Sequence, residues 1–492
     1  MQSQSATPAA TRDAIRQSPL FRQQAFIDGA WRSAAAERVI AVDDPYSGET
    51  IGTVPDLDEP AVQGAIDAAA RAFGDWSRRP ASERGALLRR WHDLIVASRE
   101  MLAGLITLEN GKPLREARAE IDYGASFVAF YAEEATRALG ETIPAPGPGR
   151  QLRAEREPIG VCVAITPWNF PNAMLTRKLA PALAAGCTMV AKPASQTPLS
   201  ALALAALAQE AGFPDGVVNI VTGKAAMIGD LVTASDIVRK ISFTGSTGVG
   251  AALMQASGRT IKRLSLELGG NAPLLIFDDA DIDMAVETAI VAKFRNCGQS
   301  CIAANRIYVQ AGIHDRFVAA FAERVAAMTL GDGFDEASDI GPLIDAAAVA
   351  KVNEHLDAAL AGGATLLAGG RGEGRMMPPS LLCGVRPDAL LTREETFGPL
   401  APIIRFERYD EALALANDTP FGLAAYICSS DPRTIARAAR DLECGMVGIN
   451  TGLISNAAAP FGGVKQSGLG REGSHHGLEE YLNIKYLCQA GL

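Results

Sequence analysis

VCVAIT (161–166) is the first of four short apolar runs, and the others are CTMVAK (187–192), VVNIVTG (217–223) and VRKISFTG (238–245). The helix-like stretches AMLTRKLAPALAAG and SALALAALAQEAG separate the first three runs. This alternation of strand and helix predicts a parallel sheet with helices on both faces. Ligands on such sheets bind beyond the carboxyl ends of the strands. The rule directs attention to residues 166–171, 192–195 and 244–250.

Further blocks flank this region. Residues 60–137 are rich in Ala, Arg and Glu and carry apolar residues at helical spacing, which predicts several helices. The pattern of residues 23–55 predicts short strands joined by turns, and the small, polar residues 1–20 predict a flexible tail. A second strand–helix alternation, from about residue 272 to 450, predicts a second α/β lobe.

Two distant segments predict an arm. GETIPAPGPGR (140–150) is a break that a helix cannot cross. The segment EYLNIKYLC (480–488) is extended and has no obvious local partner, and the charged, alternating QLRAEREP (151–158) could pair with it. Such an arm is a natural oligomer contact, which suggests a homodimer or homotetramer.

The composition narrows the class of protein. The chain has 492 residues and a net charge of −10, which disfavours nucleic acid or an anionic membrane as the main partner. Its eight cysteines are too sparse for a disulfide scaffold, so we expect a reducing, cytoplasmic location. Neither a Cys-x-x-Cys pair nor a His-Glu-x-x-His motif occurs, so we expect no metal site.

Three side chains are candidates for acyl chemistry. Cys301 follows a Gly-Gln-Ser turn, where free backbone N–H groups could depress a thiol pKa and hold an oxyanion. Glu267 ends a strand before two glycines that let a ligand or another backbone approach. Asn169 lies between Pro167 and Pro171 and could donate its amide to an oxyanion. The alternative readings are a structural cysteine, a solvated carboxylate and an ordinary turn asparagine.

FTGSTGVG (243–250) is a Gly-rich turn between strand and helix. Its Gly-x-x-Gly-x-Gly spacing departs from the usual dinucleotide fingerprint, and such turns often serve only as helix caps.

Taken together, the ordered motifs resemble the aldehyde dehydrogenase superfamily from about residue 22 to the end. Within it the chain looks most like succinate-semialdehyde dehydrogenase, through TRK at 176–178, KFRN at 293–296, INTGLIS at 449–455 and the ending YLNIKYLC. The superfamily motifs are TPWNFP (166–171), AKPASQTP (191–198), FTGSTGVG, LELGGNAP (266–273), GQSCIAANR, EETFGPL (394–400) and PFGGVKQSGLGREG (460–473).

The resemblance implies a role for each catalytic candidate. Cys301 matches a nucleophile that forms a thiohemiacetal and then a thioester. Asn169 and the Cys301 N–H match the oxyanion donors, and Glu267 matches the base that activates water. Glu472 matches a residue that relays protons away from this base. The cofactor contacts implied in the same way are Thr166, Pro167, Trp168, Lys192, Ser195, Gly245, Ser246, Glu395 and Phe397.

The resemblance also bears on the cofactor. NAD-preferring relatives often carry Glu three residues after the family lysine, whereas this chain has Ser195 after Lys192. A hydroxyl can donate to a 2′-phosphate that a carboxylate would repel, so we expect NADP to be preferred and NAD accepted. The alternative is that Ser195 merely permits both. Related enzymes often carry a second cysteine two residues after the nucleophile, but that position here is Ala303. We expect Cys297, four residues before Cys301, to be inert; the alternative is that it takes the redox role of the missing cysteine.

Arg177, Arg295 and Ser455 match the carboxylate-binding residues of succinate-semialdehyde dehydrogenases. The implied substrate is therefore succinate semialdehyde. The alternatives are glutarate semialdehyde, a broad range of aliphatic aldehydes, or a catalytically silent structural relative. The two arginines could instead be surface or structural residues.

The fold that follows from the resemblance is α/β and aldehyde dehydrogenase-like. We expect a Rossmann-type cofactor domain from residues 21–139 and 160–268 and a catalytic α/β domain at 269–450. The β oligomerisation arm would comprise residues 140–159 and 475–492. Residues 451–474 would form an active-site loop and return segment.

Overall fold

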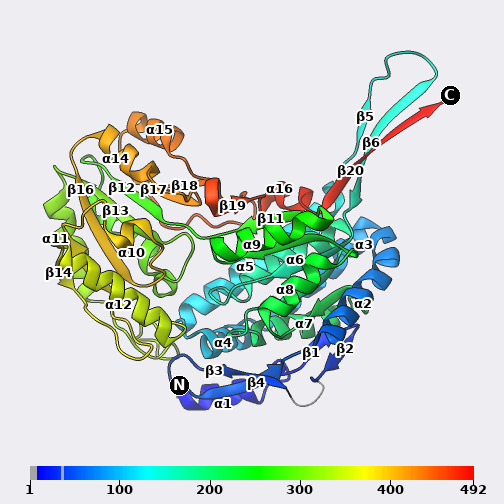
Figure 1. Ribbon diagram of the computed structural model, residues 1–492, viewed down its shortest axis with the longest axis horizontal. Coiled ribbons are helices and arrows are strands. Elements are labelled where there is room, and N and C mark those ends of the chain that lie inside the picture. The colour runs from blue at the N-terminus through cyan, green and yellow to red at the C-terminus, as the bar shows by residue number, and fades with distance from the viewer. Residues whose placement is uncertain (1–7, 35–37, 492) are drawn as a thin grey trace, which may run out of the picture.

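The computed structural model describes residues 8–34 and 38–491, which form two lobes and a projecting arm (Figure 1). One lobe is built on an eight-stranded sheet, the other on a seven-stranded sheet, and the arm on three strands. The predicted α/β class is therefore confirmed.

The centre of the first sheet is parallel, as the strand–helix alternation predicted. Three short strands run antiparallel at its edges. In spatial order the strands are β19 (Gly468–Leu469), β11 (Arg263–Glu267), β10 (Val238–Thr244), β7 (Val161–Ile165), β8 (Thr188–Lys192), β9 (Val218–Ile220), β1 (Ala25–Ile27) and β2 (Ala30–Arg32).

Alternate residues of β7 pack on opposite faces of this sheet, which is why the strand is apolar throughout. Val161 and Val163 belong to one buried cluster, and Cys162 and Ala164 belong to another. The helices of this lobe are α2 (Glu59–Arg78), α3 (Ala81–Ala97), α4 (Arg99–Asn110), α5 (Leu114–Glu134), α6 (Ala173–Ala185), α7 (Leu199–Ala211), α8 (Ala225–Ala234) and α9 (Thr247–Ser257).

The second lobe has its own core around a mostly parallel sheet. Its strands, in spatial order, are β14 (Thr365–Ala368), β15 (Ser380–Cys383), β16 (Leu400–Phe406), β13 (Ala304–Gln310), β12 (Ala272–Ile276), β17 (Ala424–Cys428) and β18 (Met446–Ile449). Its helices are α10 (Ile282–Phe294), α11 (His314–Ala326), α12 (Ala346–Ala361), α13 (Leu390–Arg393), α14 (Tyr409–Asn417) and α15 (Pro432–Asp441). Among the described residues, no helix is long and apolar enough to cross a membrane.

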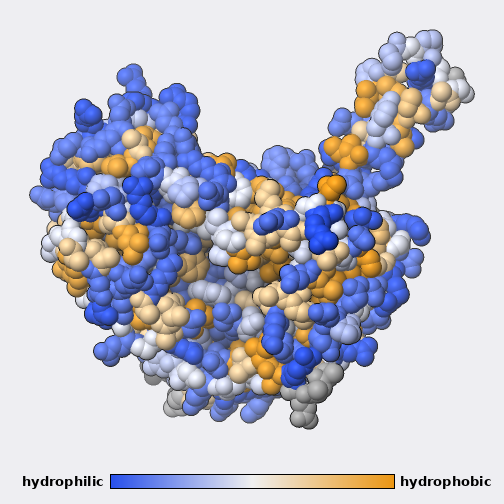
Figure 2. All heavy atoms as spheres, in the orientation of Figure 1, coloured by the Kyte–Doolittle hydropathy of each residue, from blue (hydrophilic) through white to orange (hydrophobic). Residues whose placement is uncertain are grey.

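The arm confirms the predicted long-range pairing. Strand β20 (Leu482–Ala490) runs antiparallel to β6 (Arg150–Pro158) along its whole length, and β5 (Glu141–Ile143) pairs with the other edge of β6. Helix α16 (Ser474–Glu479) leads into the arm. Figure 2 shows the arm standing clear of the body, with apolar side chains among its polar ones.

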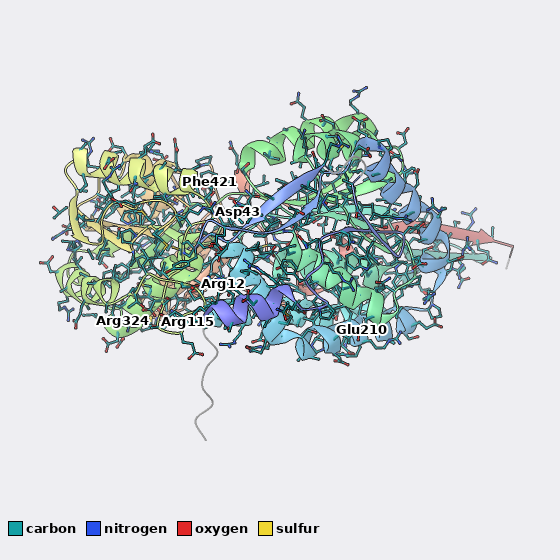
Figure 3. All side chains as sticks on the ribbon, turned by 90° about the horizontal axis from the view of Figure 1, so that it is seen from below. Arg12, Asp43, Arg115, Glu210, Arg324 and Phe421 are labelled. Atoms are coloured by element: carbon teal, nitrogen blue, oxygen red, sulfur yellow. The ribbon has the colours of Figure 1, made fainter. Side chains whose placement is uncertain are left out.

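The predicted flexible tail is wrong for residues 8–16, which form helix α1 (Pro8–Arg16). Arg12 forms ion pairs with Asp44, which follows β3 (Val39–Asp43), and with Asp332 of the second lobe. Figure 3 shows Arg12 at the boundary between the lobes. These contacts, and the burial of Ile15, order a segment whose polar sequence gave no such signal. Strand β3 pairs with β4 (Thr50–Pro55), and residues 1–7 lie outside the described part.

The connections of the first sheet reverse direction between β7 and β10, because β8 and β9 lie on one side of this point and β11 on the other. Parallel sheets bind ligands at such a switch point, beyond the carboxyl ends of the strands. The segments after β7 and β10 are therefore the expected edge of a site.

Candidate active site

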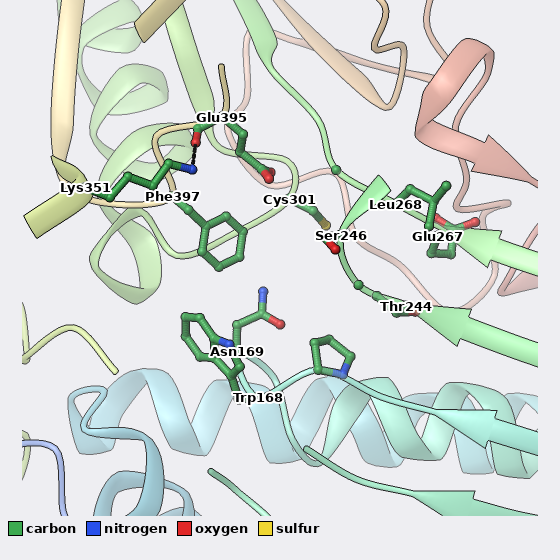
Figure 4. Close-up of a pocket in the computed structure, with 13 residues that line it drawn as sticks. Trp168, Asn169, Thr244, Ser246, Glu267, Leu268, Cys301, Lys351, Glu395 and Phe397 are labelled. Atoms are coloured by element: carbon green, nitrogen blue, oxygen red, sulfur yellow. Dashed lines mark hydrogen bonds between the residues drawn. The ribbon is translucent and has the colours of Figure 1, made fainter. Parts of the chain in front are cut away.

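A cavity of about 270 Å³ opens at this switch point, between the two lobes (Figure 4). It gathers residues from the ends of β7, β10 and β11 and from loops of the second lobe. The residues that line it are Pro167, Trp168, Asn169, Thr244, Gly245, Ser246, Glu267, Leu268, Gly269, Cys301, Lys351, Glu395 and Phe397.

Cys301 lies at the cavity on a loop that α10 and a strained turn hold in place. Asn296 and Cys297 have φ angles of 52° and 57°, in the left-handed region that such residues rarely occupy. On the other side, a Cβ atom at Gly270 would lie 2.4 Å from the Cys301 carbonyl oxygen. Only glycine allows this approach, as expected from the two glycines after Glu267.

The thiol of Cys301 does not have the depressed pKa that the sequence suggested. Burial among the surrounding side chains raises its pKa to about 12, although Arg177 and Arg295 act in the opposite direction. The thiol is therefore protonated near neutral pH in the ligand-free protein. The sequence signalled nearby backbone donors but not the apolar enclosure.

Asn169 follows β7 and carries its amide toward the loop of Cys301 (Figure 4). Its Nδ2 donates to the Gln299 carbonyl at 3.0 Å, which leaves the second N–H of the amide available to the cavity. Its own backbone oxygen accepts from Lys112 Nζ at 2.7 Å and from Asn296 Nδ2 at 2.8 Å. The amide is thus positioned by both lobes.

Glu267 ends β11, and both of its carboxyl oxygens are buried without a hydrogen-bond partner among the described residues. Burial, together with the nearby charge of Glu472, raises the pKa of Glu267 well above its usual range. Burial also acts to raise the pKa of Glu472. The positive charges of Arg177 and Lys178 outweigh this effect, so the pKa of Glu472 is lowered. Of the two carboxyl groups, Glu472 is therefore the ionised one.

The opposite side of the cavity suits a polar ligand that contains an aromatic ring. Trp168 and Phe397 meet edge to face with ring centres 5.5 Å apart. Thr244, at the end of β10, has a buried hydroxyl without a partner in the described chain, and the first turn of α9 follows it. Glu395 accepts from Gly270 N at 3.3 Å, and Lys351 Nζ donates to the Glu395 carbonyl oxygen at 2.6 Å.

Buried polar atoms without partners carry a free-energy cost unless a ligand or water satisfies them. Two such hydroxyls, on Thr166 and Thr244, lie at the ends of the two strands that flank the switch point. This arrangement fits a dinucleotide at the edge of the sheet.

A third group of predicted residues lies near the thiol but outside the cavity lining. Arg177, on α6, pairs with Glu472, and its Nη2 is buried without a partner among the described side chains. Arg295 is half-buried, with its guanidinium 5.4 Å from the centre of the Phe170 ring. Both arginines are close enough to act on the Cys301 thiol.

The comparisons with known proteins agree with this geometry. A sequence model of the aldehyde dehydrogenase family matches residues 31–487. This chain belongs to the aldehyde dehydrogenase family. The chain is similar to a glutarate-semialdehyde dehydrogenase of Pseudomonas putida, with 54% identity over 96% of this chain and 99% of that one. It is also similar to the NADP-dependent succinate-semialdehyde dehydrogenase of Escherichia coli, with 53% identity over 96% and 99%.

A solved succinate-semialdehyde dehydrogenase from Burkholderia pseudomallei has the same fold. Its TM-score is 0.95, with 52% identity over 96% of this chain and 99% of that one. The resemblance stated from the motifs is therefore confirmed.

Nine of the aldehyde dehydrogenase residues predicted from the sequence meet in the one cavity. Lys192 and Ser195 do not line it. They lie at and beyond the end of the neighbouring strand β8, and Lys192 is buried with its Nζ on the Pro193 carbonyl. Ser195 instead lines a separate cavity of about 180 Å³, together with Glu109 and Arg375.

Sequence reasoning missed several residues of this aldehyde dehydrogenase site. Lys351 comes from α12, which has no motif to mark it. Tyr123 has a buried hydroxyl without a hydrogen-bond partner in the described structure, near Arg177 and Ser455. Its position on α5, far from every motif, gave no signal. The exposed group His475, His476 and Glu479 on α16 brings three possible metal ligands together, but it does not line the cavity.

Proposed function

We propose that this aldehyde dehydrogenase oxidises succinate semialdehyde to succinate, with NADP as the preferred cofactor and NAD accepted. The observation that supports this choice of substrate is the cluster of cationic and polar hydrogen-bond donors around the Cys301 thiol. Arg177 Nη2 is buried without a hydrogen-bond partner among the described residues, and the Tyr123 hydroxyl and Ser455 lie next to it. A carboxylate is the ligand that satisfies such donors, and arginine can bind it through two hydrogen bonds.

The proposed reaction begins when the Cys301 thiol loses its proton to water and the thiolate Sγ attacks the aldehyde carbon. The free N–H of the Asn169 amide and the Cys301 N–H stabilise the negative charge that develops on the oxygen. The bound nicotinamide supplies the hydride acceptor, and a thioester on Cys301 remains. Residues Trp168 and Phe397 would flank the ring, and Gly245 and Ser246 would lie against the pyrophosphate.

Hydrolysis of the thioester needs a base and a route for the proton. Glu267 lies in the same cavity as Cys301 and is the proposed base for water. Since its pKa is raised, Glu267 must lose a proton before each such step. Glu472 is ionised and lies close to Glu267, so it is the proposed relay for that proton; because its pKa is lowered, it would hold the proton only in passing and release it to water.

The cofactor preference rests on the residue beyond β8. Ser195 is half-buried and offers a hydroxyl where a carboxylate would repel a 2′-phosphate. Lys192 and Glu395 are the proposed contacts to the two riboses. The NADP named for the Escherichia coli relative supports the same preference.

Glutarate semialdehyde is the second candidate substrate, because the relative that acts on it is as similar to this chain as the succinate-semialdehyde relative. The two acids differ by one methylene group, which a hydrophobic pocket distinguishes by only about 1–3 kcal/mol.

Initial rates of NADPH and NADH formation test the proposal. The purified protein is given succinate semialdehyde, glutarate semialdehyde and butanal with each cofactor. We expect kcat/KM to be highest for succinate semialdehyde with NADP, and we expect Cys301→Ala to be inactive while it still binds NADP. A preference for butanal would overturn the substrate, and activity in Cys301→Ala would overturn the mechanism.

We propose that the chain assembles through the arm into a homodimer or homotetramer, and that it acts in the cytoplasm. Ile484 and Tyr486 on β20 are 64% and 60% exposed, which is unusual for large apolar side chains that lie close together. Sedimentation of the full chain, with Ile484→Lys as the variant, would measure this assembly.

A further inference from the structure

The start of α5 sends three charged side chains into the seam between the lobes. Lys112 lies two residues before the helix begins at Leu114, and Glu116 and Glu120 lie on its first two turns. Both Lys112 and Glu120 have side chains that are only 1% exposed, so neither takes part in ordinary surface solvation.

Lys112 and Glu120 hold the segment that carries the oxyanion donor. Lys112 Nζ lies 2.6 Å from Glu120 Oε2 and donates to the Asn169 carbonyl at 2.7 Å. Glu120 Oε1 accepts from the backbone N–H groups of Asn172 and Ala173 at 2.9 and 3.2 Å, at the start of α6. The pair therefore fixes both ends of the turn from Asn169 to Asn172.

Glu116 holds the segment that carries the nucleophile. Its Oε2 accepts from the backbone N–H of Asn296 at 2.8 Å. Asn296 and Cys297 are the two left-handed residues of the turn before Cys301, a conformation that costs of order 1–3 kcal/mol each unless the surroundings hold it. The Asn296 amide then donates to the Asn169 carbonyl, which closes the network between the lobes.

We propose that Lys112 and Glu116 are positioning residues that set the Asn169 amide against the Cys301 thiol. The inference rests on the proposed roles of Asn169 and Cys301. Neither Lys112 nor Glu116 lines the cavity, so both act through the backbone that they hold. A buried ion pair contributes little net stability, whereas its fixed geometry can define one arrangement of two loops.

The decisive variant is Glu116→Leu, which removes the acceptor of the Asn296 N–H and leaves the cavity lining intact. A displacement of about 1 Å at a reacting group can cost about 10²-fold in rate. We therefore expect kcat to fall by about 10²-fold on both succinate semialdehyde and butanal, while KM for each changes less than about threefold. Glu116→Gln keeps an acceptor oxygen and should restore kcat to within about fivefold of the original protein.

The double variant Lys112→Met/Glu120→Gln tests the other side of the seam. It removes the ion pair without leaving a lone buried charge, and the glutamine oxygen can still accept from Asn172 and Ala173. We expect the same loss of kcat on both aldehydes. Arg115→Ala is the matched control, since Arg115 lies on the same turn but points to Asp339 at the surface, and it should leave kcat unchanged.

The outcomes separate this inference from the proposed substrate. If the original protein prefers butanal, the substrate proposal fails, but Glu116→Leu must still lose kcat on butanal. Lower thermal stability with normal kcat in Glu116→Leu would overturn the positioning role. A loss of kcat confined to succinate semialdehyde would also overturn the positioning role. That result would mean that Glu116 acts through the neighbouring Arg295 on the substrate carboxylate. If Glu116→Leu is too unstable to assay, Glu116→Asp, which draws the acceptor back by one methylene, must show a loss in the same direction.

Discussion

Replacing Arg295 and Arg177 one at a time should have different consequences, because the structure gives the two arginines different neighbours. Arg295 is half-buried and lies over the Phe170 ring. Arg177 is 1% exposed and pairs with Glu472. From the sequence alone, the two residues were equivalent members of a carboxylate site.

The size of the effect follows from the charge pair that is lost. Removing one partner of a desolvated charge pair costs about 2–5 kcal/mol. Since Arg295 keeps some solvent contact, the lower end applies, and about 2 kcal/mol corresponds to about 30-fold in kcat/KM for succinate semialdehyde. Butanal carries no carboxylate, so Arg295→Ala should lower its kcat/KM by less than about threefold.

Arg177→Ala removes more than a substrate contact. Among the described residues it leaves Lys178 as the one cation paired with buried Glu472, and it removes a cation that opposes the raised pKa values of Cys301 and Glu267. We therefore expect both aldehydes to lose at least about 30-fold in kcat/KM.

Steady-state NADPH formation with both aldehydes measures these losses. Arg324→Ala is the control, since Arg324 is an exposed arginine of α11 paired with Glu287 (Figure 3). Equal losses on both aldehydes in Arg295→Ala would refute its role in carboxylate binding. A selective loss in Arg177→Ala, with butanal unaffected, would refute the link from Arg177 to Glu472 and Glu267 in their proposed roles.

Other variants test the remaining roles. Glu267→Gln should form the thioester but hydrolyse it slowly, so mass spectrometry should find an acyl group on the Cys301 peptide; normal turnover would contradict this. Asn169→Ala should lose about 10²–10³ in kcat, and a loss under about tenfold would leave Asn169 as a turn residue only. Ser195→Glu should lower kcat/KM for NADP far more than for NAD, because like charges repel, and equal losses would contradict it. Because the Cys301 pKa is raised to about 12, its thiolate fraction should grow with pH. Iodoacetamide should then alkylate the ligand-free protein about tenfold faster per pH unit from about pH 7 to about pH 10, and a plateau near pH 8 would contradict it.

The fold could be predicted well because its signals are local and repeated. The alternation from residue 161 to 245 reports a parallel sheet directly, since each strand is apolar on both faces. The pairing of β20 with β6 was also predictable, because both segments are extended and β20 has no partner near it in sequence. Helix α1 was not predictable, since contacts with residues far along the chain order it.

The features of the candidate site also divide into those that the sequence could predict and those that it could not. Cys301, Asn169 and Glu267 each follow a recognisable element, so motif and topology together bring them to one edge. The protonation of Cys301 could not be predicted, because a pKa depends on everything packed around the group, and the thiol prediction was wrong for that reason. Residues that act through the backbone, such as Glu116, carry no motif and become visible only through their contacts.

The electrostatics of the site also explain why two arginines would serve one carboxylate. Arg177 and Arg295 both lower the pKa of the Cys301 thiol, against burial. A bound substrate carboxylate cancels about one positive charge near the thiol, and a nearby anion makes a thiolate harder to form. With a single arginine, binding the charged substrate would therefore suppress the nucleophile that must attack it. Although Arg177 pairs with Glu472, the second arginine would still lower the pKa of the thiol after binding, so recognition of the acid and formation of the thiolate would be compatible in the proposed site.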